Sequence, residues 1–333
     1  MAIIFERPLV SIIVPNWNGK NVLRTCLNSL ENLTYPNYEV IVVDNGSTDG
    51  SKEMITKEFP RVRLVANSRN LGFAGGCNLG VKFAKGDIIA LVNNDATAKP
   101  SWLTKLVETV HQGTNVGVVG GVIFYDNPGD ILWSSGARID LISGIDWRVG
   151  HGKRLSQAKT VGDIDYLPGT ALVFPRKLLY RAGLFDENYF FYCEDLDWTL
   201  CVRRLGYSCK LNPSAIVWHK ASMSRRKMQL QGYYHQMRGL FRVYFKHFPL
   251  RYLVTSLFFQ LVIFPIFEPL FFGTSPLFTL QRIRAFAWNL TKLKETIIER
   301  YEANSMGKLK LKNRFREFLS VAKDHALSKN YDF

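Results

Sequence analysis

Carboxylate and amide side chains stand directly after two apolar, β-branched runs of this sequence. Asp44 follows the run 38–43, and Asn93-Asn94-Asp95 follows the run 88–92. In an open α/β sheet such positions meet at the carboxyl edge of the strands, where ligands bind. One carboxylate there can accept hydrogen bonds from a base or ribose, and another can hold a divalent metal against a diphosphate. Asp and Asn are also ordinary turn formers, so each signal alone is weak.

A second pair of carboxylates, Glu194-Asp195, opens a predicted helix over 194–205 and follows the aromatic run 190–192. The aromatic side chains could exclude water, and a carboxylate near an acceptor hydroxyl could then act as a general base. Carboxylates in a first helical turn are also favoured by the helix dipole alone. From these residues by themselves, both interpretations stay open.

The segment 70–80 is rich in glycine and precedes a predicted helix. Glycines there allow backbone N–H groups to approach an anion closely, although helix-packing glycines in a loop are the alternative. The segment lacks the GK[ST] ending of a phosphate-binding loop and is not a GxGxxG fingerprint after the first strand, which disfavours a kinase or a dehydrogenase. His219 follows an extended run and is a candidate metal or diphosphate ligand, whereas His235 and His247 are predicted to be surface residues.

The element pattern predicts an α/β fold. Strands over 10–15, 38–43, 62–66 and 88–92 alternate with helices that end near Glu31, run from Ser47 to about Phe59, and begin at Pro100. Such alternation implies right-handed crossovers and a mostly parallel, Rossmann-like sheet. Strands over 117–124, 131–139 and 170–174, with 208–211 extended, then predict a mixed sheet, and 144–163 is a candidate mobile flap. We expect three parts, 1–120, 121–222 and 223–333.

The net charge of +15 points to an anionic partner: nucleic acid, an acidic membrane surface or a phosphate-bearing substrate. Basic residues gather in 219–246 and again after Arg282, around the apolar, aromatic segment 252–272. This arrangement favours a membrane surface over nucleic acid, because the aromatic residues are not interleaved with the basic ones. A basic solvated surface beside a core helix is the alternative.

The segment 252–272 has nearly the length of about 20 apolar residues that a membrane span requires. Thr255, Ser256 and Gln260 make the run less apolar. A break in the run is expected at Pro265, Glu268 and Pro269. We therefore expect a helix and turn lying in the membrane interface, with a single span or a buried accessory helix as alternatives. The five cysteines form no CxxC pair, and the first residues lack a secretory pattern, so we expect reduced thiols and a cytoplasmic, peripheral protein on the cytoplasmic face of the cell membrane.

Taken together, the segments 10–19, 42–50, 70–78, 93–95 and 194–197 resemble family 2 glycosyltransferases, particularly the rhamnosyltransferase-like branch that builds surface glycans of bacteria and archaea. The resemblance covers roughly residues 8–222. It implies a GT-A fold, with a nucleotide-sugar-binding half at 1–120 and a mixed-sheet acceptor and catalytic half at 121–222. Residues 223–333 would then be a helical, membrane-associating region. The implied reaction is direct displacement with inversion at the anomeric carbon.

The resemblance also implies roles for individual residues. Asp195 matches the catalytic base, with Glu194 beside it orienting the acceptor, and Asp95 matches the last carboxylate of the metal-binding DxD motif, which His219 completes in some relatives. The first position of that motif is Asn93, which contributes no negative charge. The implied donor site, with Asn78 near the diphosphate, comprises Pro15, Asn18, Asp44, Asn45, Asn78, Asn93 and Asn94.

The resulting hypothesis is an inverting transferase that uses Mg²⁺ or Mn²⁺ and a nucleotide-sugar donor, dTDP-rhamnose or a UDP-sugar. Its acceptor would be a hydroxyl of a lipid-linked glycan or oligosaccharide, and no nucleic acid is expected. The alternatives are transfer to a polyprenyl phosphate, as in relatives of dolichol-phosphate mannose synthase, and a non-catalytic nucleotide-sugar or glycan-binding protein. The hypothesis requires Asp95 and Asp195 to face each other across one cleft.

Overall fold

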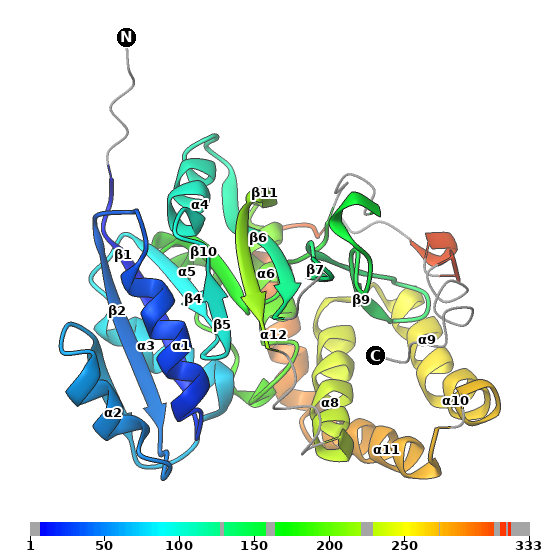
Figure 1. The fold of residues 1–333 in the computed structure, drawn as a ribbon. Helices are drawn as coiled ribbons and strands as arrows, with labels where there is room; N and C mark the ends of the chain where they lie inside the picture. Colours follow the sequence, from blue (N-terminus) through cyan, green and yellow to red (C-terminus); the bar gives the residue numbers. More distant parts are fainter. Residues whose placement is uncertain are drawn as a thin grey trace. The chain divides into compact units, whose positions relative to one another are not determined.

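The computed structural model describes residues 7–126, 130–157, 164–220, 229–272, 274–309, 314–317 and 319–320 of the chain. It divides into two compact units (Figure 1). The first comprises Met1–Ala137 and Arg148–Met228, and the second comprises Arg138–Trp147 and Gln229–Phe333. The second unit thus takes a short stretch from the middle of the chain, which no pattern in the sequence indicates.

A nine-stranded sheet forms the centre of the first unit, in the order β3-β2-β1-β4-β10-β6-β11-β5, with β7 paired to β6. The pairs β3-β2, β2-β1, β1-β4 and β6-β11 are parallel, whereas β10 runs antiparallel to both of its neighbours. The strands are β1 (Val10–Asn16), β2 (Tyr38–Asn45), β3 (Arg63–Asn67), β4 (Ile88–Val92), β5 (Ala96–Ala98), β6 (Val116–Tyr125), β7 (Leu132–Ser134), β10 (Ala171–Pro175) and β11 (Ser208–His219).

The strand directions decide which residues meet at one edge of the sheet. Because β10 is antiparallel to β4 and to β6, the strands β6 and β11 run in the same direction as β4. The carboxyl ends of β1, β2, β4 and β11 and the amino end of β10 therefore share one edge. A small second sheet joins β8 (Ala137–Ile139) to β9 (Asp146–Arg148).

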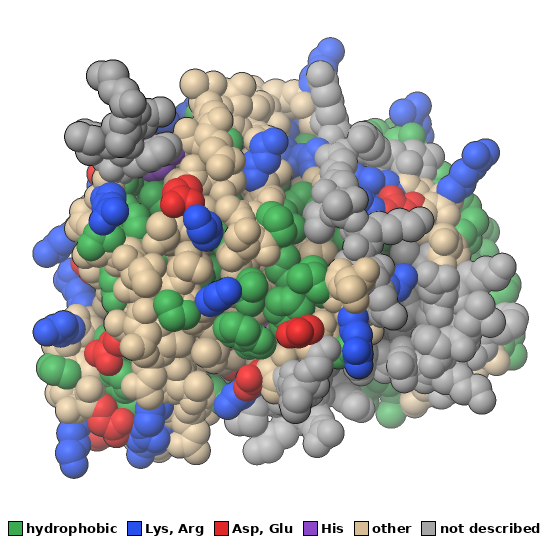
Figure 2. All heavy atoms as spheres, turned by 45° about the horizontal axis from the view of Figure 1, so that its top comes forward, with side chains coloured by type: hydrophobic (Ala, Val, Ile, Leu, Met, Phe, Trp, Pro, Cys, Tyr) green, Lys and Arg blue, Asp and Glu red, His purple; other side chains and the backbone are tan. Residues whose placement is uncertain are grey.

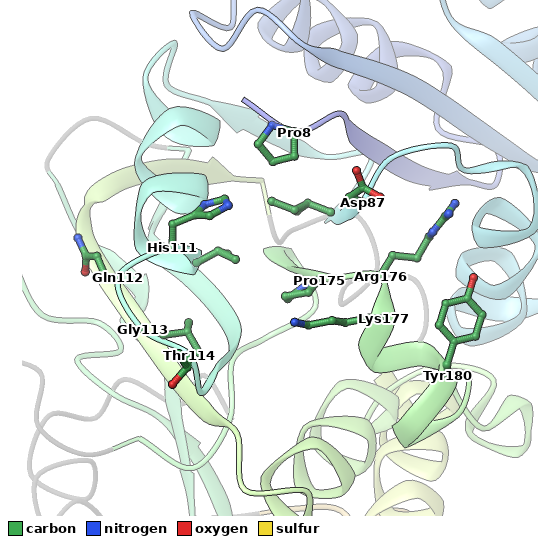
Figure 3. Close-up of a pocket in the computed structure, with 13 residues that line it drawn as sticks. Pro8, Asp87, His111, Gln112, Gly113, Thr114, Pro175, Arg176, Lys177 and Tyr180 are labelled. Atoms are coloured by element: carbon green, nitrogen blue, oxygen red, sulfur yellow. The ribbon is translucent and has the colours of Figure 1, made fainter. Parts of the chain in front are cut away.

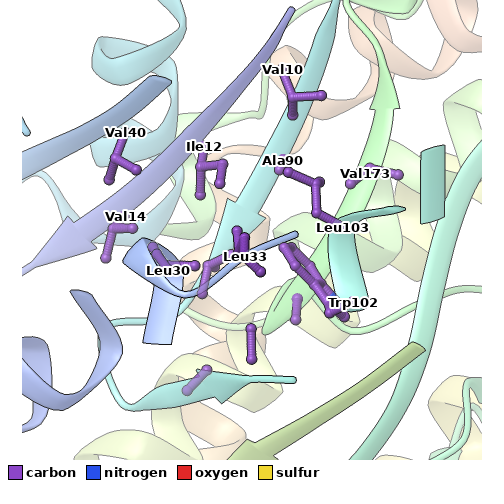
Figure 4. Close-up of a cluster of buried hydrophobic side chains, with 14 of the residues drawn as sticks. Val10, Ile12, Val14, Leu30, Leu33, Val40, Ala90, Trp102, Leu103 and Val173 are labelled. Carbon is purple, nitrogen blue, oxygen red and sulfur yellow. The ribbon is translucent and has the colours of Figure 1, made fainter. Parts of the chain in front are cut away.

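Helices cover both faces of the large sheet. The side chains of Ile12 and Val14 belong to a buried cluster with α1 and α4, which includes the fully buried Trp102 (Figure 4). The opposite face receives α3, whose Gly80 lies against Ile13 and Val43. The helices of this unit are α1 (Lys20–Glu31), α2 (Ser51–Glu58), α3 (Gly72–Phe83), α4 (Trp102–Val110), α5 (Lys177–Ala182) and α6 (Glu194–Arg204), with single 3₁₀ turns at Leu155–Gln157 and Glu187–Tyr189.

Several elements differ from the sequence-based expectations. The predicted strand 131–139 is two strands, β7 and β8, and β11 is much longer than 208–211 because it pairs along β6. The glycine-rich segment is mainly the helix α3 itself and not a loop before it. Helix α2 begins at Ser51 and not at Ser47, whose hydroxyl accepts the Asn18 N–H at 2.9 Å in the loop before the helix. Residues 158–163 of the candidate flap lie outside the described residues.

Apart from the stretch Arg138–Trp147, which contributes to β8 and β9, the secondary structure described in the second unit is helical. Its helices are α8 (Gln229–His247), α9 (Leu250–Phe258), α10 (Phe264–Phe272), α11 (Pro276–Thr291) and α12 (Leu293–Ser305), and a π turn over Phe259–Ile263 joins α9 to α10. The expectation that Pro265 and Pro269 break this segment was wrong. The Phe264 N–H bonds to the Phe259 carbonyl five residues back, and this wider turn accommodates the proline that follows. Leu250–Leu270 is long and apolar enough to cross a membrane.

Candidate active site

Asp95 and His219 are brought together by the antiparallel pairing of β5 with β11. His219 ends β11 and pairs with Ala96, the first residue of β5. The imidazole Nε2 consequently lies 3.0 Å from Asp95 Oδ1, and the Lys220 N–H donates to the Asp95 carbonyl at 3.1 Å. The two side chains are only 8% and 13% exposed. A carboxylate oxygen and an imidazole nitrogen this close together can both be ligands of one divalent metal ion.

Aromatic packing holds the His219 ring. The indole of Trp133, on β7, meets the imidazole edge-on with 4.7 Å between ring centroids, and the Arg148 guanidinium lies 4.5 Å above the indole. Among the described residues, the buried Nδ1 of His219 has no hydrogen-bond partner. The usual second hydrogen bond that orients a metal-binding histidine is therefore missing here, and the Trp133 contact fixes the ring in its place.

A polar network crosses the ends of β4, β1 and β2. The Asn94 amide donates to Asn16 at 2.7 Å, and the Asn16 amide donates to Asp44 Oδ2 at 3.2 Å. The other oxygen, Oδ1 of Asp44, accepts the Ser47 N–H at 2.9 Å. Asp44 is fully buried, so its carboxylate orders the loops after β1 and β2 in this structure. Asp44 was predicted to bind the donor, and Ser47 links it to the exposed Asn18, whose N–H donates to the Ser47 hydroxyl at 2.9 Å.

The remaining predicted donor-site residues differ in their surroundings. Asn18 is exposed and its side-chain oxygen accepts the Thr48 N–H at 2.8 Å, while Pro15 is partly buried. Asn45 is buried and donates to the Gly72 carbonyl at 3.1 Å. Asn78 is buried in α3, where its amide both donates to the Phe185 carbonyl and accepts the Phe185 N–H, at 2.8 and 3.0 Å. Asn78 thus ties α3 to the segment that leads to α6.

Asp195 lies at the same sheet edge as Asp95. The Asn93 N–H donates to the Thr170 carbonyl at 2.8 Å, immediately before β10, and the adjacent Gly169 N–H donates to Asp195 Oδ2 at 2.7 Å. Two successive residues therefore connect the Asn93–Asp95 segment to the carboxylate at the start of α6. Gly169 was not among the predicted site residues. Nothing in the residue types before the 170–174 strand indicates that its N–H donates to Asp195.

Glu194 is buried next to Asp195. Burial raises the pKa of the Glu194 carboxyl well above its usual range, and the neighbouring charge of Asp195 raises it further. Its Oε2 is buried and finds no hydrogen-bond partner among the described residues. Burial also raises the pKa of the Cys77 thiol on α3, and the charges of the same two carboxylates raise it further. The chain before α6 is strained, because Phe190, Tyr192 and Cys193 all have positive φ.

Two further features are a pair of histidines in the second unit and a hollow in the first unit. His235 and His247 belong to the second unit, where both are largely buried; the prediction that they are surface residues was wrong. A hollow of about 580 Å³ lies at the opposite edge of the sheet, where β4 and β6 begin, and is lined by Asp87, His111 and Lys177 among others (Figure 3). It contains none of the predicted site residues.

Comparison with solved structures shows the fold. A mannosyltransferase from Pyrobaculum calidifontis, solved in complex with GDP-Man and Mn²⁺, is similar over 90% of this chain and 88% of its own, with a TM-score of 0.56 and 20% identity. GalNAc-T7, solved with UDP, GalNAc and Mn²⁺, matches 88% of this chain and 58% of its own, with a TM-score of 0.59 and 16% identity. The chain has the GT-A fold, as expected.

Sequence comparison shows the family. The chain is 31% identical to the uncharacterized protein y4gI of Sinorhizobium fredii over 66% of its length, and 29% identical to the glycosyltransferase AglE of Haloferax volcanii over 64%. It spans 25% of the first relative and 67% of the second. The model of glycosyl transferase family 2 matches residues 11–182, just over half of the chain. The protein therefore belongs to glycosyl transferase family 2.

Proposed function

We propose that this glycosyltransferase moves a sugar from a nucleoside-diphosphate donor to an acceptor hydroxyl, with inversion at the anomeric carbon. The observation that carries the proposal is the continuous link from Asn93 through Thr170 and Gly169 to Asp195. This link supports the proposal, because the candidate metal ligands Asp95 and His219 and the candidate base Asp195 then belong to one edge of one sheet. A displacement reaction needs both groups, one at the leaving group and one at the nucleophile.

Asp95 and His219 would hold the divalent metal. When bound, the ion would offset the charge that grows on the departing diphosphate. A set of metal ligands with one carboxylate and one imidazole favours Mn²⁺ over Mg²⁺, because Mg²⁺ prefers oxygen ligands alone. The amide of Asn93 adds no charge to the site, so the affinity for metal should depend strongly on His219.

Asp195 would act as the base. It would take the proton of the acceptor hydroxyl as that oxygen attacks the anomeric carbon from the face opposite to the leaving nucleoside diphosphate. The N–H groups of Gly169 and Leu196, both 2.7 Å from its oxygens, fix the plane of the carboxylate. Glu194 is buried beside Asp195, so in this proposal it acts through Asp195 and positions the base.

The donor sugar and the acceptor are the finer part of the proposal. We propose dTDP-rhamnose or a UDP-sugar as donor and a lipid-linked glycan as acceptor, at the cytoplasmic face of a membrane. A panel of nucleotide sugars, each scored by the rise in melting temperature with Mn²⁺ and with Mg²⁺, would identify the donor. A polyprenyl phosphate in place of a hydroxyl acceptor tests the alternative reaction.

The variant Asp195→Asn tests the base. We expect it to lose transfer by at least a factor of about 10³ while the donor-induced thermal stabilisation stays nearly unchanged. The matched control is Asp87→Asn, an exposed carboxylate at the opposite sheet edge, which should keep full activity. Retained transfer by Asp195→Asn would exclude it as the base, and retained transfer to a polyprenyl phosphate alone would favour the alternative reaction.

A further inference from the structure

One side of the segment α9-π-α10 is an apolar stripe open to solvent. The stripe recurs at every fourth residue, and its side chains are between 42% and 74% exposed. Its members are Leu250, Val254, Phe258, Val262, Ile266 and Leu270. A soluble protein rarely leaves so long a continuous row of large apolar side chains uncovered.

The opposite side of the same segment is polar and packed against its own unit. Ser256 donates to the Leu141 carbonyl at 2.8 Å, and Gln260 donates to the Ser143 carbonyl at 3.1 Å. About two turns further along, Glu268 accepts from Arg282 of α11 at 2.7 Å. The inward residues 256, 260, 264 and 268 also recur at every fourth position. The segment therefore has two faces along its whole length.

The π turn keeps these two faces in register. In a regular α-helix a step of four residues rotates by about 40° beyond a full turn, so a stripe with that spacing would drift around the helix. The wider turn over Phe259–Ile263 needs more residues per turn and rotates the following residues back. This offsets part of the drift, and Val262, Ile266 and Leu270 are exposed like Val254 and Phe258 before the turn.

The neighbouring helix α11 shows the same division. Its Leu277, Leu280, Ile283 and Leu290 are exposed, while Arg282, Ala285 and Asn289 are buried. The bridge from Arg282 to Glu268 joins the inward faces of α10 and α11. The same helices carry exposed cationic side chains, Arg251 on α9 and Arg284 on α11.

We infer that α9, α10 and α11 form a docking surface for an anionic lipid bilayer and lie in its interface without crossing it. A segment that crosses alone must bury every side in hydrocarbon, and this one has a hydrogen-bonded polar side from Ser256 to Glu268. An amphipathic helix with cations beside its apolar stripe suits the interface. The net charge of +15 adds attraction to anionic lipid.

The charge distribution fits a membrane better than nucleic acid. On the face shown in Figure 2, Lys and Arg side chains are scattered among neutral and acidic ones and form no single continuous stripe. A bilayer surface attracts such dispersed charge, whereas a nucleic-acid groove requires cations along one track. The inference rests on the proposed function only in that a lipid-linked acceptor requires an enzyme at a membrane.

Vesicle flotation of the purified full-length chain tests the surface. We expect binding to vesicles of phosphatidylcholine with 30% phosphatidylglycerol, and at least tenfold weaker binding to phosphatidylcholine alone or at high salt. Ile266→Asp should reduce binding at least tenfold, because it puts a charge into the apolar stripe. The matched control is Tyr180→Asp, an 80% exposed aromatic of the first unit, which should bind as the unchanged protein does.

Three outcomes would overturn the inference. Equal binding by Ile266→Asp and Tyr180→Asp would exclude the stripe as the contact. Resistance of the vesicle-bound protein to alkaline carbonate would show a crossing segment. A concentration-dependent dimer that Ile266→Asp dissociates, with no vesicle binding, would assign the stripe to a second copy of the chain. Metal-dependent hydrolysis of the donor in solution is measured in parallel, because its loss would count against the proposed function and not against the docking surface.

Discussion

Replacing Gly72 by alanine tests how the segment before Asp195 is held in place. Gly72 begins α3 with a φ of +72°, and a Cβ atom there would lie 2.1 Å from the carbonyl oxygen of Phe190. The Phe73 N–H donates to that same oxygen at 2.7 Å. The contact is therefore a direct backbone link between α3 and the strained turn that precedes Glu194 and Asp195.

The expected cost has three parts. An alanine with left-handed backbone loses about 1 kcal/mol relative to glycine. The Phe190 carbonyl must move by more than about 1 Å to reach ordinary contact, which breaks its hydrogen bond and costs about 1 kcal/mol more. Displacement of the strained turn adds about 1 kcal/mol. The sum of about 3 kcal/mol corresponds to a fall in melting temperature of roughly 6–12 °C for a unit of this size.

Gly206→Ala is the matched control, because Gly206 also has a positive φ but no atom lies within 4 Å of its Cβ position. It should cost only the backbone part, a fall of roughly 2–4 °C. Both variants are measured by thermal unfolding, and transfer is assayed at a temperature where each is folded. We expect Gly72→Ala to lose a factor of about 10² in kcat/KM through misplacement of Asp195. Equal effects of the two variants would refute the link.

Three further predictions follow from buried groups. Burial raises the pKa of Glu194, so the stability that this group contributes is complete below its unfolded value of about 4.3 and is lost as the pH rises through the folded-state pKa. Glu194→Gln removes that loss, so the melting temperature of the variant should rise relative to that of the unchanged protein as the pH increases above about 4.3. A difference that does not change with pH would contradict the burial argument. Trp133→Ala should weaken Mn²⁺ binding about tenfold in calorimetry, because the indole supports the His219 ring. Trp133→Phe should restore most of the affinity. Unchanged Mn²⁺ affinity in Trp133→Ala would show that the His219 ring needs no support. Arg242→Met breaks a buried bridge from α8 to α12 and should lower the free energy of unfolding by about 3 kcal/mol in denaturant titration, whereas Arg24→Ala, in an exposed ion pair, should change nothing measurable.

The first unit could be predicted well from the sequence because its periodic signals are strong. The strand at Ile88–Val92 and the helix that begins at Glu194 lie where they were expected. Runs of β-branched residues closed by Asp, Asn and Gly leave few alternatives for such segments. The weaker expectation concerned β11, where only 208–211 was predicted, because polar residues and Pro213 interrupt its pattern.

The failures have a common physical cause, which is tertiary contact. The glycines of α3 look like an anion-binding loop in isolation, yet they face Ile13, Asn45 and Phe190, where no larger side chain fits. Pro265 and Pro269 are typical of helix breaks, yet α10 includes both of them, and the π turn accommodates Pro265. Trp133 and Gly169, which support His219 and Asp195, lie in segments without any motif, so only the folded chain reveals their partners.

Two of the most recognisable residues of the sequence, Asp44 and Asn78, make contacts that stabilise the fold. Asp44 and Asn78 are buried, and the side-chain oxygen of each accepts a backbone N–H. Asp44 accepts from Ser47 in the loop after β2, and Asn78 accepts from Phe185 in the segment before α6. Their removal would leave buried N–H groups without acceptors, which costs about 1–3 kcal/mol for each group. Loss of transfer in Asp44→Ala or Asn78→Ala is therefore expected even if neither residue touches the donor. Only loss of donor-induced stabilisation at a temperature well below unfolding, with stability unchanged, would assign either residue to the ligand.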